Sequence, residues 1–450
     1  MSTLNKILLV NPSRFNFKED CLPPVVLGYL ASWVMHYCGA KVMISDETIG
    51  SNVIRDMESF KPDLVGITAM TEFALRGYEI ATEAKRRGIL TVMGGKHATV
   101  LPEEAARHVD IVVKGPGELA LSEIINGKRD SIIEGSPVED LDLVPPIPWE
   151  LLSMPRYLTN YKNVPSFASV FWPSKLGFIM TSRGCPNSCM FCYNSSENKK
   201  LRFMSPVRVI SDIIDLKERY KIESLCFLDD NLLANRKNLR EICALMLKNN
   251  LKLKWMCASS VNYVTEDILE IIKEAGCVQL FFGFESGSQR ILSLLKEKKF
   301  FTIENNLKAI AACRKAGIRV GGSFILGTPT ETESEIRDTI SFIRSNSLDS
   351  VNIQHAKPYP GTRLWDMCKE KNTIPANFTW DSYDTTSFSE NFSWNELAGL
   401  LVEAVDEKNK YTLQRALNRI KHQPQILFRM FYDQRYFHIT KSVIKNTLRL

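Results

Sequence analysis

The chain has 450 residues, of which 44% are hydrophobic, so it is long enough for two or three packed domains. It begins without the long apolar core of a signal peptide and holds no run of roughly 18 uncharged apolar residues, which predicts a globular cytoplasmic protein. The net charge of +6 is concentrated after residue 407, so the body is slightly acidic and no basic stripe indicates a nucleic-acid binder.

The first part of the chain alternates short apolar runs with helical patterns. We predict parallel strands at 7–10, 41–44, 64–67, 90–93 and 111–113, and crossover helices at 25–37, 52–60, 72–87 and 102–108. This alternation indicates a doubly wound, Rossmann-like α/β domain over 1–136, with ligands bound beyond the carboxyl ends of the strands. The candidate ligand residues at those ends are Thr68, Met70, Gly94, Gly95 and His97. For the histidine we favour a packing or capping role.

A linker over 137–172 follows, and its three prolines at 145, 146 and 148 are expected to forbid regular structure. The aromatic segment 155–175 is a candidate specificity region. A second domain is predicted over 173–372, with strands near 177–182, 224–228, 253–258, 278–284, 319–326 and 350–355. Six βα repeats are too few to close an eight-stranded barrel.

A loop after the first of these strands carries Cys185, Cys189 and Cys192 in a C-x-x-x-C-x-x-C spacing, with Phe191 before the third cysteine. That spacing lets one short loop wrap three thiolates around a single iron–sulfur cluster. Because such clusters usually have four thiolates, one iron would remain open to an external ligand. A zinc site would need a fourth Cys or His nearby, and the nearest downstream histidine is His355. A disulfide would not suit an intracellular chain.

The cysteine loop resembles the signature of the radical S-adenosylmethionine (SAM) enzymes. In that family the open iron of a 4Fe-4S cluster chelates the amino and carboxylate groups of SAM. One electron from the cluster then cleaves the sulfonium to give a 5′-deoxyadenosyl radical. The resemblance implies an open (β/α)6 partial TIM barrel and a reducing partner of the flavodoxin or ferredoxin type. The motif assigns no catalytic residue that acts on the substrate.

Further motifs stand at later strand ends in the order that the resemblance requires. It implies that Asp229 or Asp230 accepts the SAM amino group, although a carboxylate there often caps a helix. It also places Phe191, Glu285 and Ser286 beside SAM, where a buried carboxylate needs a partner.

The fifth strand ends in a Gly-x-Pro-x-Glu element that resembles the family's segment under the adenine. Gly327 would let the ligand approach the backbone, and for Glu331 we favour a role in the first helical turn. Residues 357–362 form a Pro-x-Pro-Gly-Thr turn that could serve only as a rigid loop. Ser260 stands where relatives often carry Arg, so the residue that holds the SAM carboxylate stays open.

The first domain resembles the cobalamin-binding domain found upstream of many such enzymes, through Pro23, Pro24 and the segments 94–99 and 115–118. The Asp-x-His-x-x-Gly motif that supplies a cobalt-ligating histidine is absent, and Pro116 replaces a common acidic residue. The resemblance therefore implies that cobalamin binds without a cobalt-ligating histidine from that motif. Some members keep the domain without the cofactor.

Together these features predict a radical SAM enzyme that uses cobalamin to methylate an unactivated carbon of a small-molecule or lipid-like biosynthetic intermediate. One alternative is a radical cyclisation or oxidation without cobalamin. Another is a non-catalytic iron–sulfur sensor or scaffold, which would have no need for SAM residues at successive strand ends.

The C-terminal region, 373–450, is predicted to be helical and ends in a strongly basic tail. Between 408 and 450, ten Lys and Arg face a single Asp, and aromatic residues stand among them. Such a segment can make a peripheral contact with an anionic membrane. The alternative, which we favour, is a helix packed on the barrel with solvated basic residues.

Overall fold

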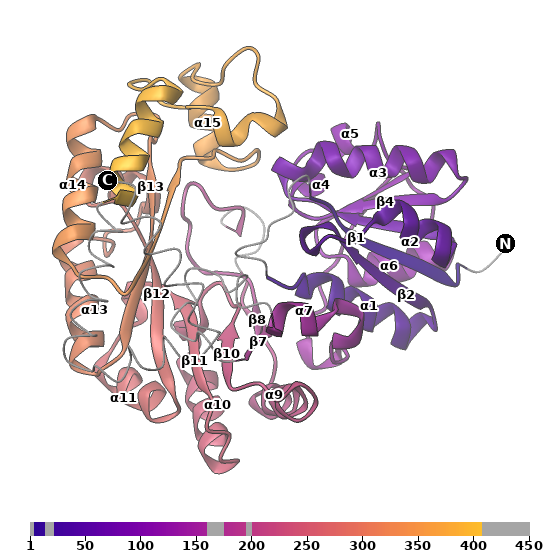
Figure 1. Cartoon of the computed structure of the whole chain (residues 1–450), viewed down its shortest axis with the longest axis horizontal. Helices are drawn as coiled ribbons and strands as arrows, with labels where there is room; N and C mark the ends of the chain where they lie inside the picture. Colours follow the sequence, from indigo (N-terminus) through magenta and orange to yellow (C-terminus); the bar gives the residue numbers. More distant parts are fainter. Residues whose placement is uncertain (1–3, 14–21, 160–174, 195–199, 407–450) are drawn as a thin grey trace, which may run out of the picture.

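Two parallel sheets of six strands each dominate the computed structural model, which describes residues 4–13, 22–159, 175–194 and 200–406. They belong to two domains that lie side by side (Figure 1). The first sheet has the order β2-β1-β3-β4-β5-β6, and the second has the order β14-β13-β12-β11-β10-β7. The predicted α/β class and both sheet types are confirmed.

All five strands predicted for the first domain are present. The strands are β1 (Lys6–Asn11), β2 (Lys41–Asp46), β3 (Leu64–Thr68), β4 (Leu90–Gly94), β5 (Ile111–Lys114) and β6 (Ile132–Glu134). The helices are α1 (Val25–Cys38), α2 (Val53–Phe60), α3 (Ala74–Arg86), α4 (Lys96–Val100), α5 (Pro102–Ala105) and α6 (Glu118–Ile125). The sequences of these strands are continuous apolar runs because apolar cores cover both faces of the sheet.

Some elements of the first domain differ from the prediction. Strand β6 was not predicted, because a three-residue edge strand leaves too short a pattern to detect. The predicted helix at 102–108 is the shorter α5, and α4, which was not predicted, ends just before Pro102. A proline has no N–H to continue α4, but it is well suited to the first turn of α5.

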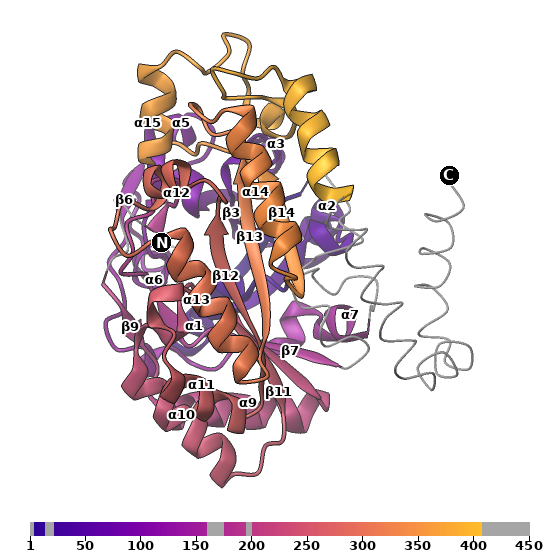
Figure 2. The same ribbon diagram turned by 90° about the vertical axis from the view of Figure 1, so that its left-hand side faces the viewer.

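The second sheet consists of β7 (Leu176–Ile179), β10 (Ser224–Phe227), β11 (Lys254–Ser259), β12 (Cys277–Glu285), β13 (Arg319–Leu326) and β14 (Ser350–His355). Its main helices are α9 (Pro206–Tyr220), α10 (Arg236–Lys248), α11 (Glu266–Glu274), α12 (Gln289–Lys296), α13 (Ile303–Lys315), α14 (Glu333–Ser345) and α15 (Arg363–Glu370). Neighbours in this sheet follow chain order, and β7 and β14 stand at opposite edges. The sheet is therefore an open half-barrel with helices along its outer side (Figure 2).

A small antiparallel pair lies at the base of the cysteine loop. Strand β8 (Ser182–Arg183) pairs with β9 (Arg202–Phe203), and this pair was not predicted. The single strand expected at 177–182 is instead two strands, interrupted after Ile179. The loop with the three cysteines thus leaves and re-enters the half-barrel at one fixed point.

The proline-rich linker is more ordered than predicted. It contains the 3₁₀ turns η3 (Leu141–Leu143) and η4 (Trp149–Leu152), followed by helix α7 (Met154–Thr159). The three prolines themselves lie outside regular structure, as expected, since the one-turn η3 ends before them and η4 begins after Pro148. Leu141, Ile147 and Trp149 are buried in a core that runs from α1 to the half-barrel.

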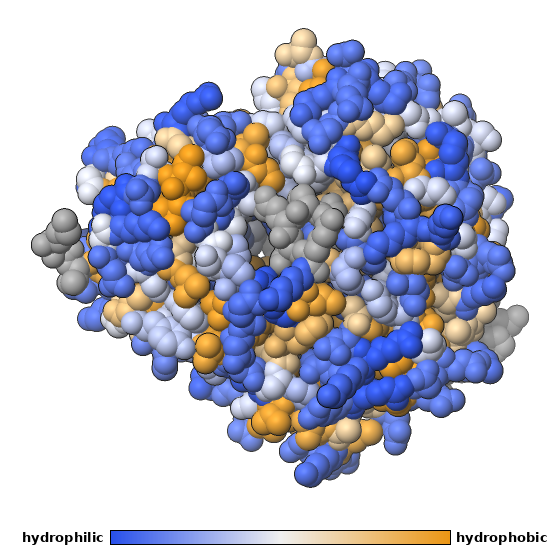
Figure 3. All heavy atoms as spheres, turned by 180° about the vertical axis from the view of Figure 1, so that it is seen from behind, coloured by the Kyte–Doolittle hydropathy of each residue, from blue (hydrophilic) through white to orange (hydrophobic). Residues whose placement is uncertain are grey.

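The C-terminal region packs against the half-barrel as far as it is described. A helix over 394–406 buries Leu397, Leu400 and Ala404 against residues of β13 and α14. The aromatic segment 160–174 and the basic tail 407–450, with their predicted specificity and membrane roles, lie outside the described residues. No helix in the described part of the chain is long and apolar enough to cross a membrane. Hydrophilic residues cover much of the described surface in Figure 3, with smaller apolar areas between them.

Candidate active site at the cysteine loop

Hydrogen bonds to two helices of the half-barrel hold the cysteine loop. The Met190 N–H donates to Leu295 O at 2.8 Å, and Met190 O accepts from the Leu364 N–H at 3.0 Å. The Lys298 ammonium donates to Pro186 O at 3.0 Å. These hydrogen bonds join the loop to α12, to the residue pair that follows it and to α15.

The thiols of Cys185, Cys189 and Cys192 lie near one another and are each partly buried. Burial raises the pKa of all three, that of Cys189 to about 12, and nearby lysines oppose the rise in each case. Among the described residues, no three Cys, His, Asp or Glu side chains are arranged to hold a single metal ion. Three converging thiols from one loop fit a cluster that binds as thiolates.

Two adjacent carboxylates after β10 have different environments. Asp229 is 2% exposed and accepts hydrogen bonds from the Thr181 N–H at 3.1 Å, the Thr181 hydroxyl at 2.8 Å and the Ser182 hydroxyl. Burial raises the pKa of Asp229 to about 6, and these bonds oppose the rise. Both carboxylate oxygens of Asp229 therefore bind the residues that follow β7.

Asp230, in contrast, is exposed and faces the cysteine loop. Its Oδ2 accepts from Asn194 Nδ2 at 2.7 Å, and its charge acts on Cys185 and Cys192. Surrounding protein atoms raise the pKa of Asp230 even though solvent reaches it, and Lys96 opposes the rise. Neither aspartate caps a helix, since Asn231 precedes the next turn and Asn235 caps α10.

Glu285 at the end of β12 has the buried partner that its charge requires. Its Oε1 lies 3.1 Å from Lys296 Nζ, and both side chains are 6% exposed. Lys296 also donates to Gly283 O at 2.9 Å, and its charge acts on Cys189. The next residue, Ser286, is fully buried, and its hydroxyl lies 3.1 Å from the Thr339 hydroxyl of α14. No sequence signal connects Lys296 to Glu285.

Gly327 and Glu331 form a compact turn after β13. Gly327 has φ +75°, and a Cβ there would lie 2.5 Å from Leu397 Cδ2. The side chain that approaches Gly327 closely therefore comes from the helix over 394–406. Glu331 is fully buried, and its Oε2 accepts from the N–H groups of Gly327 at 2.7 Å and Thr328 at 3.0 Å. The expected first-turn role of Glu331 was wrong, because Thr332 caps α14 and Glu331 precedes the cap.

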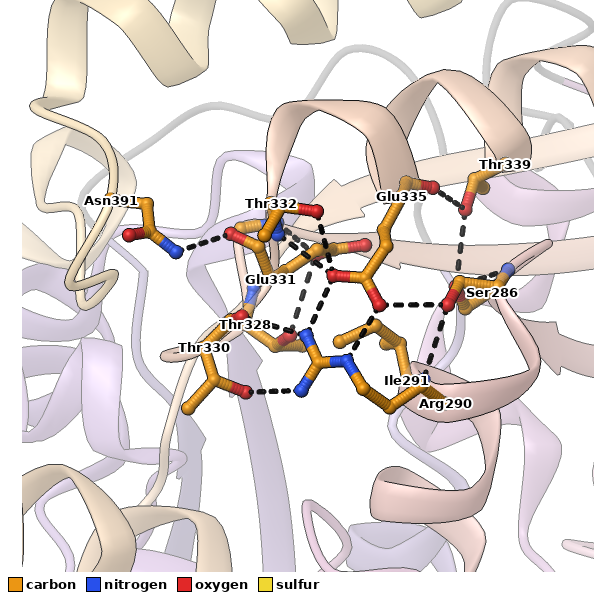
Figure 4. A network of polar contacts seen from close by, with 12 residues as sticks. Ser286, Arg290, Ile291, Thr328, Thr330, Glu331, Thr332, Glu335, Thr339 and Asn391 are labelled. Carbon is orange, nitrogen blue, oxygen red and sulfur yellow. Dashed lines mark hydrogen bonds and ion pairs between the residues drawn. The ribbon is translucent and has the colours of Figure 1, made fainter.

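A polar network beside this turn ties α12, which follows β12, to the turn and helix α14 that follow β13 (Figure 4). The Arg290 guanidinium donates to Glu335 Oε1 at 2.7 Å and to Thr330 O at 2.8 Å. Glu335 in turn accepts from the Ser288 hydroxyl at 3.0 Å and completes the cap of α14 with Thr332. The strand ends that carry Glu285 and Gly327 are thus held at a fixed separation.

The two glycines among the candidate residues of the first domain have different surroundings. A Cβ on Gly95, which has φ +90°, would lie 2.7 Å from Thr68 Oγ1 and 2.9 Å from Ala69 N, so its glycine serves the protein's own packing. A Cβ on Gly94 would meet only ordinary contacts, so nothing in the described structure requires a glycine there. A ligand that approaches this backbone would account for it. Met70 is exposed nearby.

His97 is fully buried, and its Nε2 lies 2.8 Å from the Tyr78 hydroxyl and 3.4 Å from Glu104 Oε1. Its ring also packs edge-on against Trp380 of the C-terminal region. Both observations agree with the favoured packing role. A fully buried imidazole would have to leave these partners to reach a ligand.

The cysteine loop also contacts the first domain directly. Tyr193 pairs with the Thr71 hydroxyl at 2.6 Å, and Lys96 donates to Asn194 Oδ1 at 2.9 Å. Arg183 forms an ion pair with Glu118 at 2.6 Å. Sequence reasoning missed all of these contacts, although these residues stand inside the segments it singled out. Half-buried Phe191 lies in the same loop.

Comparison with known proteins agrees with this geometry. The family model of the radical SAM superfamily matches residues 179–343, and that of the B12-binding domain matches residues 20–125. An uncharacterized methyltransferase of Pyrococcus horikoshii is 30% identical over 476 residues, covering 99% of this chain and 98% of the relative. The chain belongs to the radical SAM superfamily.

Two further relatives extend the comparison. The bacteriochlorophyllide d C-8(2)-methyltransferase of Chlorobaculum tepidum is 27% identical over 337 residues, covering 72% of this chain and 71% of the relative. The fold is similar to that of the radical SAM methyltransferase TsrM from Kitasatospora setae, solved with cobalamin and a [4Fe-4S] cluster. The TM-score is 0.69 at 17% identity, over 90% of this chain and 91% of TsrM. The radical SAM domain implies a 4Fe-4S cluster and SAM as cofactors, and the B12-binding domain implies cobalamin.

In the radical SAM domain, Glu331 generates a prediction about stability. Burial raises its pKa from 4.5 to about 7, so the stability it contributes is full below about pH 4.5 and lost as the pH rises through about 7. Glu331→Gln keeps an oxygen acceptor for the turn but cannot ionise. The wild type loses this stability when the pH is raised from 5.5 to 8, and the variant does not. The free energy of unfolding of the variant minus that of the wild type should therefore be larger at pH 8 than at pH 5.5 by on the order of 2 kcal/mol. Urea unfolding followed by circular dichroism measures the difference, and an equal difference at both pH values would contradict it.

Proposed function

We propose that this radical SAM enzyme uses cobalamin to methylate a carbon of a small-molecule or lipid-like biosynthetic intermediate. The observation that carries the proposal is the contact between the cysteine loop and the B12-binding domain, through Tyr193 with Thr71 and Asn194 with Lys96. A methyl group carried by one domain can reach a substrate activated by the other only if the two sites adjoin. The methyltransferase names of the relatives support the same reaction.

The three cysteines have one role in this proposal, which is to hold the cluster as thiolates. When loaded, the cluster supplies the electron that cleaves SAM to a 5′-deoxyadenosyl radical, and cobalamin supplies the methyl group. We propose Asp230 as the acceptor for the SAM amino group, because it is accessible beside the cysteine loop while Asp229 is buried and fully bonded. An exposed carboxylate can accept a hydrogen bond from this amino group without breaking existing bonds.

Further SAM residues are proposed at the neighbouring strand ends. Phe191 belongs to the cysteine loop, and Glu285, Ser286 and Gly327 shape the ends of β12 and β13. Since the polar atoms of Glu285 and Ser286 have protein partners, these two would act mainly by holding the wall of the site. For the SAM carboxylate, the buried donors Asn231 Nδ2 and Ser260 Oγ are candidates, because neither has a hydrogen-bond partner in the described part of the chain.

For cobalamin we propose Thr68, Met70 and Gly94, with Gly94 as the point of closest backbone approach, while Gly95 and His97 would support this wall through their contacts inside the protein. The proposed domain limits are 1–136, 137–172, 173–372 and 373–450. We also propose a cytoplasmic location, an electron donor of the flavodoxin or ferredoxin type and no nucleic-acid partner. The free thiols of the described cysteines suit a reducing compartment.

The cluster assignment is tested by removing its ligands. In full-length protein with Cys185, Cys189 and Cys192 all changed to Ala, the iron–sulfur absorbance near about 400 nm should disappear. The formation of 5′-deoxyadenosine from SAM under a strong reductant should disappear with it. Replacement of buried Cys243 by Ala is the matched control and should keep both signals. Full iron content with full SAM cleavage in the triple variant would refute the proposal.

The role of Asp230 is tested by the binding of SAM itself. Asp230→Asn removes the charge but keeps the shape, so the dissociation constant for SAM should rise about tenfold or more. The exposed Asp267→Asn, at the start of α11, serves as the control and should bind SAM like the wild type. Isothermal titration of reconstituted protein under anaerobic conditions gives both constants. Unchanged affinity in Asp230→Asn would exclude Asp230 as the amino-group acceptor.

The cobalamin proposal makes a spectroscopic prediction. Since His97 is buried and bonded to Tyr78, we expect hydroxocobalamin to bind with its own base displaced and without a protein imidazole on cobalt. After reduction to cobalt(II), the EPR spectrum should lack nitrogen hyperfine splitting. A bound cofactor that shows this splitting would contradict the predicted coordination. Absence of binding would instead favour a radical reaction without cobalamin.

A further inference from the structure

The first residue of helix α4, Lys96, reaches out of the B12-binding domain into the radical SAM domain. Its ammonium donates to Asn194 Oδ1 at 2.9 Å and lies 5.8 Å from the centre of the Tyr193 ring. Both of these residues directly follow Cys192. A charge of the first domain is therefore held against the cysteine loop.

This contact determines which way the Asn194 amide points. A lysine ammonium can only donate, so it requires the amide oxygen, and the Nδ2 of Asn194 must then point the other way. That Nδ2 donates to Asp230 Oδ2 at 2.7 Å. If the amide were reversed, two oxygens would face each other and the bond to Asp230 would be lost. Lys96 thus selects the orientation that holds the carboxylate.

The bond to Asn194 occupies one oxygen of Asp230. No hydrogen bond within the described residues involves the other oxygen, Oδ1. Because Asp230 is exposed beside the cysteine loop, this second oxygen is accessible to a hydrogen-bond donor of a ligand. The Lys96 ammonium is bonded to Asn194 and forms no ion pair with Asp230 within the described residues, although its charge reaches Asp230 and favours the ionised carboxylate.

We propose that Lys96 is a positioning residue of the SAM site, supplied by the B12-binding domain, which orients Asp230 through Asn194 to accept a hydrogen bond from the SAM amino group. The proposal rests on the proposed role of Asp230. It makes SAM binding dependent on where the B12-binding domain sits. If Lys96 served only to join the two domains, its loss would weaken the binding of a ligand with or without the amino group equally.

The test compares two ligands on anaerobically reconstituted full-length protein. One is SAM, and the other is a SAM analogue that lacks the α-amino group. Lys96→Met should weaken SAM binding about tenfold and leave the binding of the analogue within about twofold of the wild type. Lys96→Arg keeps a cationic donor and should restore most of the affinity for SAM. Lys128→Met, which removes an exposed lysine of the same domain, is the control and should change neither constant.

A double-mutant cycle shows whether the effect passes through Asn194. Asn194→Leu should weaken SAM binding like Lys96→Met, and the two changes together should cost no more than either alone. Additive losses, equal losses for both ligands, or unchanged SAM affinity in Lys96→Met would each overturn the proposal. If Asp230→Asn alone left SAM binding unchanged, the assigned role of Asp230 would fail. The methylation proposal would then still stand on its own test.

Discussion

One buried carboxylate determines where the site can form. Asp229 collects hydrogen bonds from the backbone and hydroxyl of Thr181 and from the hydroxyl of Ser182, so the end of β7 is tied to the end of β10. Burying this group is costly, and the bonds offset that cost. The cysteine loop starts three residues later, and its direction follows from this anchor. The same anchor leaves Asp230 accessible.

Around this anchor the loop is held from three sides. Helices α12 and α15 bind its backbone, the β8–β9 pair closes its base, and the B12-binding domain contacts Arg183, Tyr193 and Asn194. Contacts from several elements are what a precisely positioned site requires. It also places the candidate cobalamin residues at the same interface as the candidate SAM residues.

The sequence was informative where the relevant signal is local. Apolar runs predicted the strands of both sheets, and the spacing of Cys185, Cys189 and Cys192 predicted a common ligand set. It failed where a residue's role depends on a distant partner. Two adjacent aspartates look alike in sequence, and they are distinguished only by their partners, Thr181 and Ser182 for the first and Asn194 for the second. The pairing of Glu285 with Lys296 and the burial of Glu331 before its helix likewise arise only when strands and helices meet.

The continuous apolar core has a consequence for how this architecture can change. Residues of α1, the linker and the half-barrel belong to one buried cluster, and the Tyr29 hydroxyl donates to Met180 O across the same boundary. The two halves are therefore not interchangeable modules. A gene fusion that exchanged only the first 136 residues for those of a relative would leave Trp149 and Ile147 against a foreign helix. Recombination between such enzymes would succeed only if the linker travelled with the domain on which it packs.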